Sequence, residues 1–241
     1  MDHFLFTAVS GANRSLAQQK IHANNLSNVN TQGFRADLER SITTRVAGKG
    51  YATRFPIALE NAGVDMTAGM LKETGLDLDI ALKDRGLIAL QDGNREVYTR
   101  DGHINIGANG ELTVHQLPLL GDGGAIVLPP HSSLSIARDG TISIVPQDGI
   151  AIPADIDRIK LVDIPANELR KNDRGLLITD LPTHPRDEGI LIENRYLEGS
   201  NISAVSEMLS SISIGRYFEV QINMIKIAKE LAQAGNKLLQ G

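Results

Sequence analysis

Both ends of the chain carry apolar residues at the three- and four-residue spacing of an α-helix. The N-terminal stripe consists of Leu5, Val9, Ala12, Leu16, Ala23 and Leu26. The C-terminal stripe consists of Val205, Leu209, Ile212, Phe218, Ile222, Ile225 and Ala232. The spacing predicts two long amphipathic helices, about 2–28 and 201–239, with Asn201 as the N-cap of the second.

The middle of the chain changes from helical spacing to alternation. Turn dipeptides recur at Asp92-Gly93, Asp101-Gly102, Asn109-Gly110, Asp122-Gly123, Asp139-Gly140 and Asp148-Gly149. Asp-Gly and Asn-Gly are strong hairpin signals. Apolar residues at every second position follow three of these turns, in the pairs Ile104/Ile106, Leu112/Val114 and Ile142/Ile144. This pattern predicts half-buried strands in a β-rich domain, either a hairpin meander or a small barrel.

These patterns predict an α+β protein whose terminal helices pair as a coiled-coil-like hairpin. We expect residues 1–35 and 198–241 to form the terminal helical domain and residues 74–197 to form the central β domain. Residues 36–73 follow neither period, so they are expected to form an irregular extended connector.

Composition excludes several classes of function. The 241 residues carry a net charge of −5, with 4% aromatic residues and no Trp, which disfavours nucleic-acid binding. No apolar run approaches the roughly 18 residues of a membrane span. The chain has no cysteine, which excludes thiol catalysis, disulfides and Cys-ligated zinc. Asp2 and the short apolar run Phe4–Phe6 do not resemble a cleaved secretory signal.

The candidate catalytic groups are weak. The six histidines are scattered without metal-ligand spacing, and the glycines of residues 121–125 lack the Lys-Ser/Thr of a phosphate loop. Asp77 and Asp79 form one possible acid–base pair, and Glu193 and Glu198 form another. The simpler interpretation is a solvent-facing alternation for the first pair and a structural junction for the second. We therefore predict no enzyme activity, no cofactor and no metal.

Amide side chains gather where the first helix is expected to end. Asn24, Asn25, Asn28 and Asn30 lie within seven residues of "HANNLSNVNTQGFRA" (22–36), and Gly33 permits a turn. "LEGSN" (197–201) precedes the second helix and forms the matching junction at its start. Capping is the simplest role for these amides, but it does not require four asparagines. The alternative is that the surplus amides bind adjacent subunits.

Three blocks of the chain resemble one family. "ANNLSNVNTQGF" (23–34) closely resembles the N-terminal signature of the bacterial flagellar rod and hook proteins. "LEGSNISAVSEM" with "RYFEVQINMIK" (197–226) resembles their C-terminal signature, and "TGLDLDIALKDRGLIAL" with "YTRDG" resembles their central β segment. Ser27, Gln32 and Ile202 depart from the usual residues, and "RGLIAL" lacks the family's frequent aromatic pair. The opening and the length are most similar to a proximal-rod member.

The resemblance implies a structural subunit that is exported through the flagellar type III apparatus without a cleaved signal. Such subunits assemble in the periplasm, with copies of themselves and with other rod proteins, into a tube that transmits torque from motor to hook. Nucleic-acid binding and membrane insertion are not expected. The subunit-interface residues expected from the helical stripes and the two signatures are Leu5, Val9, Ala12, Leu16, Asn24, Asn25, Leu26, Asn28, Gly33, Phe34, Glu198, Gly199, Ser200, Asn201, Val205, Leu209, Ile212, Phe218, Ile222 and Ile225.

Other functions stay open at this point. The chain can be a distal-rod or other rod paralogue, a secreted β-domain binding module whose helices only dimerise, or a secreted glycan-cutting enzyme that uses the paired carboxylates. The length of any polymers would separate the rod protein from the module, and turnover of peptidoglycan would support the enzyme.

Overall fold

The computed structural model describes residues 2–43, 57–147 and 152–240, and the chain forms two compact units. The helical unit contains residues 1–27, 37–62 and 203–241. The β unit contains residues 28–36 and 63–202. The chain therefore passes between the units four times, after Ser27, Ala36, Ala62 and Ile202. Helices at both ends and strands in the middle confirm the predicted α+β class.

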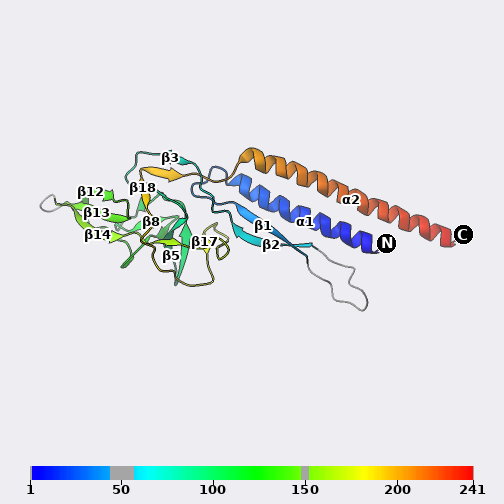
Figure 1. Cartoon of the computed structure of the whole chain (residues 1–241), viewed down its shortest axis with the longest axis horizontal. Helices are drawn as coiled ribbons and strands as arrows, with labels where there is room; N and C mark the ends of the chain where they lie inside the picture. Colours follow the sequence, from blue (N-terminus) through cyan, green and yellow to red (C-terminus); the bar gives the residue numbers. More distant parts are fainter. Residues whose placement is uncertain (1, 44–56, 148–151, 241) are drawn as a thin grey trace. The chain divides into compact units, whose positions relative to one another are not determined.

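The helical unit is built on two long helices, α1 (Asp2–Ser27) and α2 (Ala204–Gln240). They lie side by side and run antiparallel, with both chain ends at the same end of the pair (Figure 1). His22 pairs with Glu207, and the Gln221 amide lies against Gly11, which fixes the antiparallel register. Strands β1 (Asp37–Thr43) and β2 (Ile57–Val64) pair as a two-stranded sheet, and β1 contacts α1.

Small side chains form the seam between the two helices. On α1, Ala8, Ala12 and Ser15 are buried, whereas the neighbouring Leu5, Val9 and Leu16 are exposed. On α2 the covered positions recur at a spacing of four and three residues, in the order Glu207, Ser211, Ile214, Phe218, Gln221, Ile225 and Ala228. This heptad spacing suits an antiparallel helix pair. The seam is only partly apolar, because it includes Glu207, Ser211 and Gln221. Each helix also has a second apolar face, which is exposed to solvent.

The β unit contains the remaining short strands. They are β3 (Leu71–Glu73), β4 (Ile80–Leu82), β5 (Gly86–Asp92), β6 (Arg95–Thr99), β7 (Asn105–Ile106), β8 (Leu112–Val114), β9 (Leu117–Pro118), β10 (Leu120–Gly121), β11 (Gly124–Ala125), β12 (His131–Ile136), β13 (Thr141–Pro146), β14 (Ala154–Arg158), β15 (Leu161–Asp163), β16 (Arg170–Lys171), β17 (Leu177–Ile178), β18 (Ile192–Asn194) and β19 (Tyr196–Glu198). The largest sheet has the order β15-β5-β6-β17-β16. Smaller sheets are β12-β13-β14, β7-β8-β9, β10-β11, β18-β4 and β19-β3.

The sheet around β5 and β6 carries an apolar core on each face. Ile88, Leu90 and Val97 belong to the larger core, while Leu87 and Tyr98 belong to the smaller one. Side chains alternate between the two faces of a strand, so a continuous apolar run such as "GLIAL" supplies both cores. The β unit therefore has its own hydrophobic interior.

Four of the predicted turns join paired strands. The loops at Asp92-Gly93, Asn109-Gly110, Asp122-Gly123 and Asp139-Gly140 connect β5-β6, β7-β8, β10-β11 and β12-β13. Leu112, Val114, Ile142 and Ile144 are buried as their alternation predicts, whereas Ile106 is exposed. Asp148-Gly149 lies outside the described residues.

Three predictions differ from the structure. Residues 36–73 are not an irregular connector, because they contain β1, β2 and β3. Asp101-Gly102 is not a hairpin turn, because the strands on either side of it pair with other strands: β6 with β5 and β17, and β7 with β8. Gly102 instead passes so close to the Ile80 carbonyl that a Cβ would lie 1.7 Å from it. Asn201 is not the N-cap, because α2 begins at Ala204 and the Ser203 hydroxyl accepts the Ser206 amide at 3.5 Å. Closure into a barrel stays a prediction.

Candidate functional site

A cluster of three charged residues lies within the β unit. Glu198, at the end of β19, is 1% exposed and lies between Arg35 and Arg100, which are also 1% exposed. Arg35 Nη2 is 2.6 Å from Glu198 Oε1, and Arg100 Nε donates to Glu198 Oε2 at 2.8 Å. Charged residues are rarely buried unless they are paired. The cluster is therefore a specific feature of this fold.

Arg100 joins the cluster to the largest sheet. Its guanidinium donates to the Asp84 and Gly86 carbonyls through Nη1 and to the Leu82 carbonyl through Nη2. Burial lowers the pKa of Arg100, while the Glu198 carboxylate opposes this shift. An arginine side chain stays protonated in proteins, so the cluster of two cations and one anion keeps a positive charge.

Asn201 forms a second hub three residues after Glu198. Its Oδ1 accepts the Ala36 amide at 2.8 Å, and its Nδ2 donates to the Asp65 carbonyl at 2.9 Å. Its backbone amide donates to the Phe34 carbonyl at 3.3 Å. We call the segments 28–36, 63–70 and 195–202, which these two hubs join, the junction.

Glycines let the junction segments approach one another. Gly33 has φ +64°, donates its amide to the Glu198 carbonyl at 2.8 Å, and lies so close to the next segment that a Cβ would be 2.2 Å from the Asp101 nitrogen. A Cβ at Gly69 would lie 2.1 Å from the Gly199 carbonyl oxygen, and the Gly69 amide donates to Glu198 Oε1 at 2.7 Å. Larger residues cannot occupy these positions without moving the backbone.

The asparagines of the N-terminal signature have partners within the chain. Asn25 is buried, accepts the Asp37 amide at 3.0 Å and donates to the Asp37 carbonyl at 3.4 Å. Asn24 donates to the Asp37 carboxylate, and Asn28 accepts the Thr31 hydroxyl. α1 ends at Ser27, one residue before its predicted end, and only Gly33 in this turn adopts positive φ. The amides thus order the start of β1 and the turn.

The predicted interface residues separate into two groups. Leu5, Val9, Leu16, Asn24, Val205, Leu209 and Ile212 are exposed on the helical unit. The remaining thirteen are buried or half-buried within the chain: Ala12, Asn25, Leu26, Asn28, Gly33, Phe34, Glu198, Gly199, Ser200, Asn201, Phe218, Ile222 and Ile225. Sequence reasoning missed Arg35 and Arg100, because no spacing rule relates residues that are 163 and 98 positions from Glu198.

The carboxylates considered for catalysis are paired with basic side chains. Asp79 is 2.7 Å from His103 Nδ1, Asp77 pairs with Arg195, and Glu193 pairs with Lys83. Among the described residues, no group of three or more His, Asp or Glu side chains suits a metal ion.

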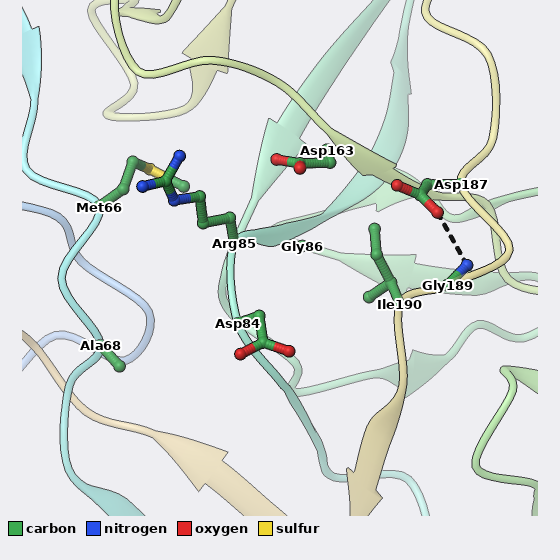
Figure 2. Close-up of a pocket in the computed structure, with 9 residues that line it drawn as sticks. All are labelled: Met66, Ala68, Asp84, Arg85, Gly86, Asp163, Asp187, Gly189 and Ile190. Atoms are coloured by element: carbon green, nitrogen blue, oxygen red, sulfur yellow. Dashed lines mark hydrogen bonds between the residues drawn. The ribbon is translucent and has the colours of Figure 1, made fainter.

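A cavity of about 510 Å³ lies elsewhere on the β unit and is lined by Met66, Ala68, Asp84, Arg85, Gly86, Asp163, Asp187, Gly189 and Ile190. In Figure 2 the Arg85 side chain extends toward Met66, and Asp187 accepts the Gly189 amide at 2.7 Å. The lining mixes acidic, basic and apolar groups without a nucleophile–base pair, so the cavity shows no catalytic constellation.

Comparison with known proteins identifies the family. The chain is 38% identical to the flagellar basal-body rod protein FlgF of Salmonella typhimurium, over 99% of both chains. It is 36% identical to FlgF of Escherichia coli over 99% of both chains, and 27% identical to FlgG of Bacillus subtilis over 95% of this chain and 96% of that protein. The chain belongs to the flagellar basal-body rod proteins.

The matched segments coincide with the helices and the junction. Residues 5–35 match the family "Flagella basal body rod protein", and residues 193–238 match "Flagellar basal body rod FlgEFG protein C-terminal". The higher identity to the FlgF proteins confirms the predicted resemblance within the rod and hook family, and a distal-rod paralogue is not favoured. The chain is a structural subunit of the flagellar rod, and its relatives are named as rod proteins, not as enzymes.

Proposed function

We propose that this rod subunit assembles through the exposed faces of α1 and α2 into the tube of the proximal rod, where it transmits torque toward the hook. Its partners are copies of itself and other rod proteins. The observation that carries the proposal is a row of exposed apolar side chains on one face of each helix, which Arg216 and Asn223 interrupt on α2.

The outer stripe of α2 is long and well exposed. It consists of Val205, Leu209, Ile212, Val220, Ile227 and Leu231, and each of these residues is more than half exposed. Burying one such side chain contributes about 1.5–3 kcal/mol. Exposed apolar surface of this extent marks a protein-interaction site in soluble proteins.

The seam between the two helices buries too little apolar surface to stabilise the pair strongly. Its α1 side is made of Ala8, Ala12 and Ser15, so the helix pair buries little apolar area by itself. Neighbouring helices would bury the outer stripes and convert a marginal pair into a bundle with coiled-coil packing. Of the predicted interface residues, Leu5, Val9, Leu16, Val205, Leu209 and Ile212 make these contacts directly.

Export through the flagellar type III apparatus to the periplasm, without a cleaved signal, completes the proposal. Family membership supports this proposal. Among the described helices, none is both long enough and apolar enough to cross a bilayer.

The test places a charge on the outer stripe. Leu209→Asp should leave the isolated chain folded, because Leu209 is 61% exposed, but should abolish its incorporation into basal bodies. Gln233→Asp adds the same charge at an exposed polar position of α2 and should assemble normally. Circular dichroism of the purified chains and immunodetection in isolated basal bodies measure the two properties. Normal incorporation of Leu209→Asp would refute the helix-mediated assembly.

A further inference from the structure

We propose that the junction is a load-bearing clamp: Glu198 and Asn201 hold the three β-unit segments that lead to the helices, so that force on any one segment is shared by all. This inference rests on the proposed torque-transmitting function, since a clamp of this kind serves a subunit under mechanical load.

The connectivity makes a clamp necessary. The β unit meets the helical unit at four points along the chain, after Ser27, Ala36, Ala62 and Ile202. A force that enters through the helices must therefore pass along residues 28–36, 63–70 or 195–202. Without bonds between these segments, each would extend separately under tension.

The junction supplies those bonds in parallel. Asn201 bonds to Ala36 on the first segment and to Asp65 on the second. Glu198 bonds to Arg35 on the first segment, to Gly69 on the second, and to Arg100. The first and second segments are therefore both bonded to the third, which leads into α2. Bonds that are loaded side by side must break together, which resists shear better than bonds that break in turn.

Burial and charge strengthen the clamp. The three charged side chains are each 1% exposed, so water does not compete for their hydrogen bonds. Charge-assisted hydrogen bonds are roughly twice as strong as neutral ones. Arg100 then extends the load path into the sheet through the carbonyls of Leu82 and Gly86, next to β4 and β5.

A further contact supports the first segment from outside the cluster. Lys171 Nζ donates to the Arg35 carbonyl at 2.5 Å and lies 3.6 Å from the centre of the Phe34 ring. The Arg35 carbonyl is thus held by Lys171 from β16, and the Arg35 side chain is held by Glu198 from β19. A surface turn that served only to end α1 would not need these contacts.

The experiment pulls the junction apart in the purified full chain. Because the chain has no cysteine, Asn30→Cys on the first segment and Ser203→Cys directly after the third segment provide unique, exposed tether points. Optical tweezers then measure how long the junction resists a constant force. Asn201→Ala should shorten this lifetime about tenfold, the change that corresponds to about 1.4 kcal/mol. Lys171→Met, which keeps the buried ion cluster intact, should shorten it less.

A control variant and a swimming assay in cells distinguish the clamp from the proposed assembly function. Asp180→Asn removes an exposed ion pair with Arg170, which lies outside the junction, and should leave the lifetime unchanged. In cells, Asn201→Ala should be present in basal bodies but should swim more slowly than the wild type as the viscosity of the medium rises. An unchanged lifetime for both Asn201→Ala and Lys171→Met would overturn the clamp, whereas absence of the wild-type chain from rods would overturn the proposed function instead.

Discussion

The β unit and the helical unit treat their apolar residues in opposite ways. In the β unit, Ile88 and Leu90 are 0% exposed within cores that the chain completes by itself. In the helical unit, Val205 is 68% exposed and Leu209 is 61% exposed. The hydrophobic effect rewards burial in both places, so the exposed stripes require surface from other chains. The β unit thus completes its own hydrophobic cores, whereas the helical unit exposes apolar faces that other subunits can bury.

The junction belongs to the β unit, and Glu198→Gln gives the largest expected effect. The substitution leaves Arg35 and Arg100 buried without a counter-charge, and breaking a buried ion pair costs about 3–5 kcal/mol. Asp77→Asn, at an exposed pair, should cost only about 0–1 kcal/mol. Urea unfolding of the two purified chains measures both values. Equal losses would show that burial does not distinguish the junction.

A leucine-to-alanine substitution in each unit compares the two units directly. Leu90→Ala should destabilise the β unit by about 2–5 kcal/mol, because it leaves a cavity in a closed core. Leu209→Ala removes the same atoms from an exposed face and should change the stability of the isolated chain by no more than about 0.5 kcal/mol. Thermal unfolding measures both, and a large loss from Leu209→Ala would mean that its face is already covered within the chain.

Two glycines with similar backbone conformations sharpen the role of close packing. Gly75→Ala places a Cβ at φ +75° in open space and should cost about 1–2 kcal/mol from backbone strain. Gly33→Ala, at φ +64°, adds a clash with the Asp101 nitrogen and should cost more. Urea unfolding of both variants separates the strain from the clash. A smaller loss at Gly33 would show that the junction can open without penalty.

A histidine gives the smallest expected effect. The hydrogen bond to Asp101 raises the pKa of His115 above its ordinary value of 6.5, although burial opposes the shift. The stabilisation is therefore complete below about pH 6.5 and is lost as the pH rises through the raised value. His115 is partly exposed, so we expect less than about 1 kcal/mol.

Melting temperatures between pH 5.5 and about 8.5 should reveal this loss in the wild type. His115→Asn tolerates the positive φ of 51° and should remove this part of the pH dependence. Gln116→Asn replaces the other positive-φ residue of the same turn without removing a titrating group, so it should keep the wild-type slope. Identical slopes for the wild type and His115→Asn would contradict the role of the Asp101 contact.

Local signals predicted much of the secondary structure. The 3–4 spacing located both helices to within three residues at the boundaries that matter for the junction, because helix periodicity is a property of neighbouring residues. Four Asp-Gly or Asn-Gly turns were also predicted, and in three of them the glycine (Gly93, Gly110 or Gly140) adopts positive φ, which is a local requirement. The strands β1 and β2 were missed because "DLERSIT" and "IALENAGV" lack clean alternation and form only as partners of each other.

The direction of the helical stripes could not be read from their spacing. Leu5, Val9 and Leu16 were placed on one stripe with Ala12, yet Ala12 turns toward the seam and the larger residues face solvent. A helix with two apolar faces gives the same 3–4 spacing for either choice. Contact with α2 selects the small residues, because small side chains let two backbones come close.

By itself, the sequence determined where the chain is helical, where it turns, and which family signatures it carries, because each of these depends on residues close together in the chain. Only the tertiary structure decided that Arg35, Glu198 and Arg100 form one buried cluster and that Asn201 joins three segments. Arg100 and Arg35 lie 98 and 163 positions from Glu198 in the sequence, and Ala36 lies 165 positions from Asn201. Burial turns such distant residues into strong partners, and burial is a property of the whole fold.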